Sequence, residues 1–187
     1  VSFDADRNLQ TFVELEGGGL DTFKMLYQDG LYYPYVWRVR HFQEQNPNEM
    51  EIWFTPAGKP YSFRQKLGED EPGAALSRDS AFAIAMAGLT DEWSIDLEKY
   101  ELVEESEKTQ PGGRVDHSFT YQRSGFSIGE NGFLRFNLKV QGDILGEFRH
   151  YAHVPEAFNR RFSEMRSAND TIAFSATMAI GVLYVLF

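Results

Sequence analysis

Apolar and polar residues alternate along several short runs of the chain, as they do in strands with one buried face. These runs are residues 35–42 (YVWRVRHF), 51–55 (EIWFT), 61–64 (YSFR), 116–123 (DHSFTYQR), 136–140 (FNLKV) and 147–149 (EFR). Gly58 and Gly142 each separate two runs at a place where a tight hairpin needs a positive φ, and a Phe-Arg pair follows each glycine. The pattern predicts two sets of antiparallel strands.

Each set of strands follows a predicted helix start. Ser2 and Ser77 lie 75 residues apart, and each has an apolar residue before it and an aspartate, Asp4 or Asp79, two residues after it. A serine at this place can cap a helix by accepting a hydrogen bond from a free backbone N–H, and the helix dipole favours an aspartate in the first turn. The repeated pattern indicates an internal duplication, with chance similarity as the alternative.

Two copies of one helix and one antiparallel meander predict an α+β fold. The first copy spans residues 1–73 and the second spans residues 74–154. The acidic segment between Gly68 and Gly73 forms the junction, because three acids flanked by glycine and proline cannot sustain a regular element. Residues 104–113 (EESEKTQPGG) are expected to form a polar hairpin tip.

The chain ends in an apolar segment. Residues 155–170 predict a stalk helix that begins with Pro155 at its first position. Residues 171–187 (TIAFSATMAIGVLYVLF) are 17 residues without a charge, and as a helix they would span about 25 Å of a hydrocarbon core that is about 30 Å thick. We expect the start of a transmembrane helix here; the alternative is a buried helix of a soluble domain.

Composition narrows the range of partners and chemistry. The chain has 18 Lys and Arg against 28 Asp and Glu, which gives a formal net charge of −10, and no basic patch stands out. Nucleic acid is therefore not an expected partner. The absence of cysteine excludes disulfides, a thiolate nucleophile and a cysteine-ligated metal.

Few residues suggest catalysis or metal binding. His150 and His153 are close in sequence, but residues three apart on a strand face opposite sides and cannot chelate one ion. His41 and His117 are single imidazoles on predicted strands. The sequence predicts no catalytic, metal-ligating or cofactor-binding residue and no cofactor.

Other groupings have ordinary structural interpretations. The adjacent carboxylates Asp91–Glu92 and Glu104–Glu105 are interpreted as solvated charge, and Gly17–Gly19 is interpreted as a helix stop that precedes a strand. Five aromatic residues could line a peptide groove or belong to the core: Tyr32, Tyr33, Tyr35, Trp37 and Trp53.

The tandem helix and hairpin pattern resembles the PepSY-like or cystatin-like arrangement of small extracytoplasmic domains. Four segments are similar to the N-terminal non-catalytic region of some long bacterial members of the CPBP family of intramembrane metalloproteases: 116–121 (DHSFTY), 133–143 (FLRFNLKVQGD), 154–158 (VPEAF) and 164–169 (EMRSAN). In that family the catalytic glutamates and histidines belong to later membrane helices, so Glu104–Glu105 does not correspond to them.

The resemblance implies a non-catalytic binding or regulatory domain on the periplasmic or another extracytoplasmic side of a bacterial membrane. The domain would be part of a membrane-embedded protein, with residues 171–187 in contact with the membrane, and a peptide or protein would be its ligand. The alternative is a complete soluble enzyme or carrier whose C-terminal apolar helix is part of its core.

Overall fold

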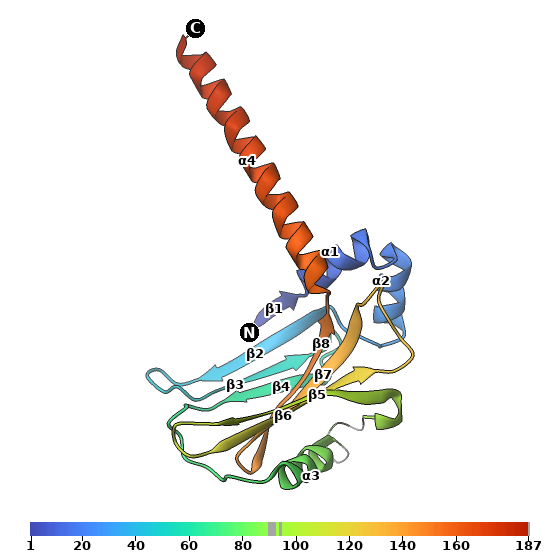
Figure 1. Ribbon diagram of the computed structural model, residues 1–187, viewed down its shortest axis with the longest axis vertical. Helices are drawn as coiled ribbons and strands as arrows, with labels where there is room; N and C mark the ends of the chain where they lie inside the picture. Colours follow the sequence, from blue (N-terminus) through green and yellow to red (C-terminus); the bar gives the residue numbers. More distant parts are fainter. Residues whose placement is uncertain (90–92, 94, 187) are drawn as a thin grey trace. The chain divides into compact units, whose positions relative to one another are not determined.

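Eight strands form one antiparallel sheet in the computed structural model, which describes residues 1–89, 93 and 95–186 (Figure 1). The strands are β1 (Ser2–Ala5), β2 (Tyr35–Phe42), β3 (Glu49–Phe54), β4 (Pro60–Lys66), β5 (Tyr100–Thr109), β6 (Val115–Arg123), β7 (Phe133–Gln141) and β8 (Ile144–His153). The helices are α1 (Arg7–Leu15), α2 (Gly19–Gln28), α3 (Arg78–Gly88), α4 (Glu156–Leu186) and the short 3₁₀ helix η2 (Leu97–Lys99). The predicted α+β class is confirmed.

The two sets of strands meet along their last strands. The spatial order is β1-β2-β3-β4-β8-β7-β6-β5, so β4 pairs with β8. Phe63 lies opposite Phe148 in this antiparallel pair, and Arg64 lies opposite Glu147. The repeated Phe-Arg pairs of the two halves therefore meet at this seam. Both halves belong to one compact unit, Val1–His153.

One of the two predicted helix starts is confirmed and the other is wrong. Ser77 caps α3 by accepting a hydrogen bond from the Ser80 N–H, and Asp79 lies in the first turn. Ser2 instead begins strand β1, which pairs with β2, and α1 is capped by the Asp6 carboxylate, 3.0 Å from the Leu9 nitrogen. The serine-aspartate spacing is compatible with a helix start and with a strand, and residues 2–5 form a strand because they pair with β2.

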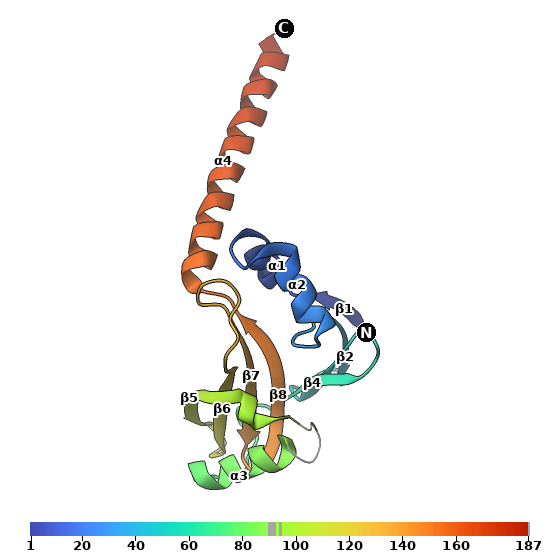
Figure 2. The same ribbon diagram turned by 90° about the vertical axis from the view of Figure 1, so that its right-hand side faces the viewer.

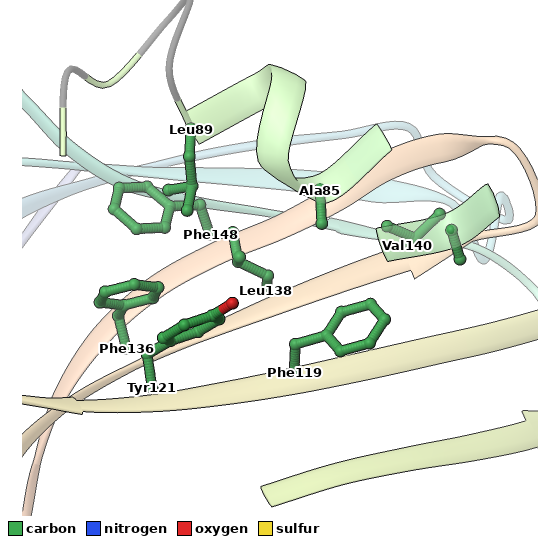
Figure 3. Close-up of a cluster of buried hydrophobic side chains, with 9 residues drawn as sticks. Ala85, Leu89, Phe119, Tyr121, Phe136, Leu138, Val140 and Phe148 are labelled. Atoms are coloured by element: carbon green, nitrogen blue, oxygen red, sulfur yellow. The ribbon is translucent and has the colours of Figure 1, made fainter. Parts of the chain in front are cut away.

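Helix α3 covers one face of the sheet over β6, β7 and β8 (Figure 3). Its small residues Ala81 and Ala85 allow it to approach closely, and both are fully buried. The strands contribute alternating residues to this core, as period-two patterning requires. The buried strand residues of the cluster are Phe119, Tyr121, Phe136, Leu138, Val140 and Phe148.

Helices α1 and α2 pack on each other at the opposite end of this unit from α3 (Figure 2). The glycines between them do end α1, as predicted. The segment that follows is helix α2 and not the expected strand, and Gly18, at φ 96°, occupies its N-cap position. A left-handed conformation at this residue favours glycine.

The segment expected to be a polar hairpin tip is largely strand. Glu104 and Glu105 lie within the edge strand β5, opposite Thr120 and Phe119 of β6. All residues of β5 after Tyr100 are exposed, so its carboxylates stay solvated while its backbone pairs. Charge on an edge strand also discourages pairing with other chains, which explains an acidic strand that resembles a loop in sequence.

A buried ion pair holds the connection between the halves. Arg114 and Asp116 have side chains only 2% and 1% exposed, and Arg114 Nε lies 2.8 Å from Asp116 Oδ1. Arg114 also donates to the backbone carbonyl of Glu71, at 2.9 Å. Burial raises the pKa of Asp116, but hydrogen bonds from Arg114 and Gln110 and the charge of Lys139 outweigh this effect and lower it.

Helix α4 belongs to the second compact unit, Val154–Phe187. It is one helix of 31 residues that includes both the predicted stalk and most of the predicted apolar tail. The side chains of Ile172 and Phe174 are each 67% exposed. Within the residues that the structure describes, no helix is sufficiently long and apolar to cross a membrane.

Substitution of a residue in the core under α3 should lower the free energy of unfolding. Phe148→Ala removes a fully buried ring at the seam and should lower the free energy of unfolding by about 3–5 kcal/mol. Phe42→Ala removes a ring that is 59% exposed and should change it by less than about 1 kcal/mol. Urea denaturation of both variants measures the difference; equal losses would contradict this core.

Candidate functional site

A cavity of about 300 Å³ lies where the N-terminal segment, the start of β2 and the paired strands β4 and β8 converge. We call it the tyrosine cavity. Ser62 and Arg149 are next to the core residues Phe63 and Phe148 in sequence, and alternation therefore turns them to the face opposite α3. The lining residues are Asp4, Ala5, Asp6, Tyr32, Tyr33, Pro34, Val36, Trp53, Tyr61, Ser62, Arg149, His150 and Tyr151.

Tyrosines form one wall of the cavity and are fixed by hydrogen bonds. The Tyr32 hydroxyl donates to Asp6 Oδ2 at 2.9 Å. Burial and the Asp6 charge raise the pKa of Tyr32 well above its ordinary value, so it stays a donor. The Tyr33 N–H donates to the Tyr61 hydroxyl at 3.4 Å, and the two rings meet edge to face at 5.1 Å.

His150 packs beneath this wall as a neutral ring. It stacks on Tyr61 with centroids 4.4 Å apart, and its Nδ1 lies 3.0 Å from the Tyr61 carbonyl oxygen. Because a carbonyl oxygen only accepts, this contact places the proton of the neutral ring on Nδ1. Burial lowers the pKa of His150 to about 4, although the hydrogen bond to Tyr61 opposes this shift. His150 is therefore a neutral, rigid support at physiological pH.

Two arginines from the repeated Phe-Arg pairs lie over the ring of Trp53. The Arg149 guanidinium lies 5.2 Å from the Trp53 ring centroid, and that of Arg64 lies 5.8 Å from it. Arg64 is also paired with the buried carboxylate of Glu51. Arg149 is exposed, and it has no carboxylate partner among the described residues.

The carboxylates of the cavity have partners of their own. Asp4 Oδ2 lies 3.0 Å from Arg38 Nε. Asp6 accepts from Tyr32 and from the Leu9 N–H at the start of α1. The cavity therefore combines an aromatic wall, two engaged carboxylates and one guanidinium that pairs with no carboxylate of the described residues.

The structure brings together three of the five aromatic residues that could line a peptide groove. Tyr32, Tyr33 and Trp53 all line the tyrosine cavity. Tyr35 and Trp37 lie elsewhere and pack on Phe3, with ring centroids 5.9 and 4.8 Å away.

The histidines are separate from one another. His117 is buried, and its Nε2 lies 2.9 Å from the Leu76 carbonyl oxygen, while His41 is exposed on β2. His153 stacks on Phe133, three residues along β8 from His150. Within the described ranges, no three metal-ligating side chains form a group that could hold an ion.

Of the two pairs of adjacent carboxylates noted in the sequence, the structure describes one. Glu104 and Glu105 are exposed on β5, and Glu105 pairs with Arg78 at 2.8 Å. Asp91–Glu92 lies outside the described residues.

Two important residues of the cavity, Tyr61 and Arg149, have no role in the sequence-based prediction. The repeated Phe-Arg pair was the sequence feature that could have indicated them. Phe63 and Phe148 lie opposite each other where β4 pairs with β8, and the arginines that follow them lie over the ring of Trp53. Their convergence depends on pairing between strands about 85 residues apart, which the pattern of one segment does not reveal.

A second cavity, of about 360 Å³, also lies along β4 and β8 but has mostly charged walls. Its charges are already satisfied: Lys139 pairs with Asp116 at 3.3 Å, and Lys66 pairs with Glu49 at 3.6 Å. The tyrosine cavity is the better candidate site because it offers apolar walls together with a guanidinium that has no carboxylate partner in the part of the chain that the structure describes.

The buried imidazole predicts a pH effect on stability. In the unfolded chain the pKa of histidine is about 6.5, above the value of about 4 for folded His150. The unfolded state therefore binds the proton first, and stability is full above about pH 6.5 and falls as the pH approaches 4. Between pH 7.5 and 5 the contribution of His150 should be about 1–2 kcal/mol.

Urea denaturation at both pH values measures this effect. The loss on acidification should be smaller in His150→Gln than in the wild type, whereas the exposed control His41→Gln should keep the full loss. An unchanged pH dependence in His150→Gln would contradict the assignment of a neutral buried ring.

Comparisons with known proteins give no relative for this chain. No protein family, no curated protein and no solved structure matches it. The function is therefore argued from the geometry of the tyrosine cavity.

Proposed function

We propose that this chain is a non-catalytic binding module whose ligand is a peptide segment of another protein. The observation that carries the proposal is the tyrosine cavity, which is lined by aromatic residues and by one guanidinium that has no carboxylate partner among the described residues. Ligand sites are typically concave and apolar with a few converging polar groups that orient the ligand. The cavity has this composition.

The size of the cavity favours part of a chain over a large cofactor. At about 300 Å³ it lies at the lower end of the range for ligand pockets. Rings of Tyr33 and Tyr61 would contact an apolar side chain, and Tyr and Trp are enriched where proteins bind one another because they combine a large apolar surface with a polar tip.

The proposal also includes attachment to a membrane through residues 171–187, with the sheet on the extracytoplasmic side. Exposed apolar side chains on the last part of α4, such as Ile172 and Phe174, support it, because large exposed apolar surfaces mark sites that interact with proteins or membranes. The resemblance to the non-catalytic region of CPBP proteases suggests the role: the module would present a substrate to, or inhibit, a membrane-embedded protease.

Trp53 provides the direct test of peptide binding. The full chain in mild detergent is applied to an array of ten-residue peptides, and the affinity of retained sequences is measured by calorimetry. Trp53→Ala should weaken binding at least tenfold, because it removes the ring that positions Arg149. Trp37→Ala alters an aromatic residue that is 44% exposed and not in the cavity, and should bind like the wild type. Equal binding by both variants would contradict the proposal.

Attachment to a membrane is tested with liposomes. The full chain should co-sediment with phosphatidylcholine vesicles, and the double variant Phe174→Asp, Ile180→Asp should not, because each aspartate in a membrane helix costs about 2.5–3.5 kcal/mol. Phe42→Asp changes an exposed ring of the sheet and should leave co-sedimentation intact. Retention of the double variant on vesicles would contradict membrane insertion.

A further inference from the structure

We infer that the tyrosine cavity recognises a carboxylate of its ligand and that Arg149 is the residue that binds it. This inference rests on the proposed function and names the chemistry of the ligand. It depends on how charges are paired on this face of the sheet.

Neighbouring arginines on the same face are already neutralised. Arg38 lies 3.2 Å from Glu51, and both Arg40 and Arg64 pair with glutamates of β3. In a chain with a net charge of −10, carboxylates are abundant. Nevertheless, Arg149 has none in the described part of the chain, so its charge remains available to a partner from outside.

The guanidinium of Arg149 also has the chemistry to bind such a partner. Its Cζ lies over the Trp53 ring, 5.2 Å from the ring centroid, and this contact restrains its position. The N–H donors of a guanidinium lie in its plane, in a fork that matches two carboxylate oxygens. A lysine would present a point charge without this geometry.

The acidic residues of the cavity do not compete for this site. Asp4 is held by Arg38, and Asp6 is held by Tyr32 and by the backbone of α1. Their negative charge would instead disfavour an anion near β1. A bound carboxylate therefore belongs on the β8 side of the cavity, beside Arg149.

The walls next to Arg149 indicate what is attached to the carboxylate. Trp53 and Tyr151 provide ring surfaces within the same cavity, so the ligand combines an anionic group with an apolar side chain. Either the free C-terminus of a peptide or an aspartate or glutamate side chain can supply this carboxylate, and the two sources are separable by experiment.

The test uses the full chain in mild detergent and four-residue N-acetyl peptides that end in phenylalanine. The peptides carry a free C-terminal carboxylate, a C-terminal amide, or a C-terminal amide with glutamate before the phenylalanine. Each is titrated into the wild type, Arg149→Gln, Arg149→Lys and Arg40→Gln. Arg40 is an exposed arginine on the same face outside the cavity, and Arg149 is exposed too, so neither substitution should unfold the protein.

We expect the free carboxylate to bind the wild type at least tenfold more tightly than the plain amide, as for a hydrogen bond to a charged group. Arg149→Gln should bind the free acid more weakly than the wild type by the same factor, and should bind the amide with unchanged affinity. Arg149→Lys should recover part of the affinity for the free acid. Arg40→Gln should match the wild type. Binding of the glutamate peptide in an Arg149-dependent manner would support the inference with a side chain as the source.

Two results would overturn the inference, and they are distinguishable. If acid and amide bind equally well and Trp53→Ala abolishes both, the carboxylate assignment is wrong while the proposed peptide-binding function stands. If none of these peptides binds and the peptide array also retains no sequence, the proposed function and the inference are both wrong.

Discussion

Pairing of β4 with β8 is the constraint on which the rest of this structure depends. The two halves of the chain contact each other through the last strand of each, and Phe63 lies opposite Phe148 at the centre of the seam. An isolated four-stranded meander would leave a sheet edge here, with unpaired backbone groups that favour aggregation. Joining the two edges satisfies these groups and produces one continuous sheet of eight strands.

The candidate site is a consequence of the same seam. Tyr61 and Ser62 come from β4, Arg149 and His150 come from β8, and Trp53 comes from the neighbouring strand β3. The ring of His150 stacks on Tyr61, and the backbone N–H of His150 donates a hydrogen bond to Ser62 Oγ at 3.1 Å. Both contacts connect the two strands beside the cavity. Neither half contains the tyrosine cavity alone, so the architecture and the proposed binding function share one set of contacts.

Sequence patterns predicted the local elements well and the long-range arrangement poorly. Alternation identified β2, and hairpin glycines were found at Gly58 and Gly142, because these signals reside in a few consecutive residues. The strand β1 and the acidic β5 were assigned incorrectly because their conformation is decided by pairing with distant strands. The same holds for the candidate site. Three of its aromatic residues were recognised from the sequence, but their place in one cavity with Arg149 could not be predicted, because it depends on the pairing of β4 with β8.

Hydrogen–deuterium exchange on the full chain tests the central role of the seam most directly. If β4 and β8 hold the halves together, the amides of β3, β4, β7 and β8 should exchange with one common free energy of opening, equal to that of global unfolding. If residues 1–66 instead open at a clearly lower free energy while β6, β7 and β8 stay protected, the halves are independent and the account is wrong.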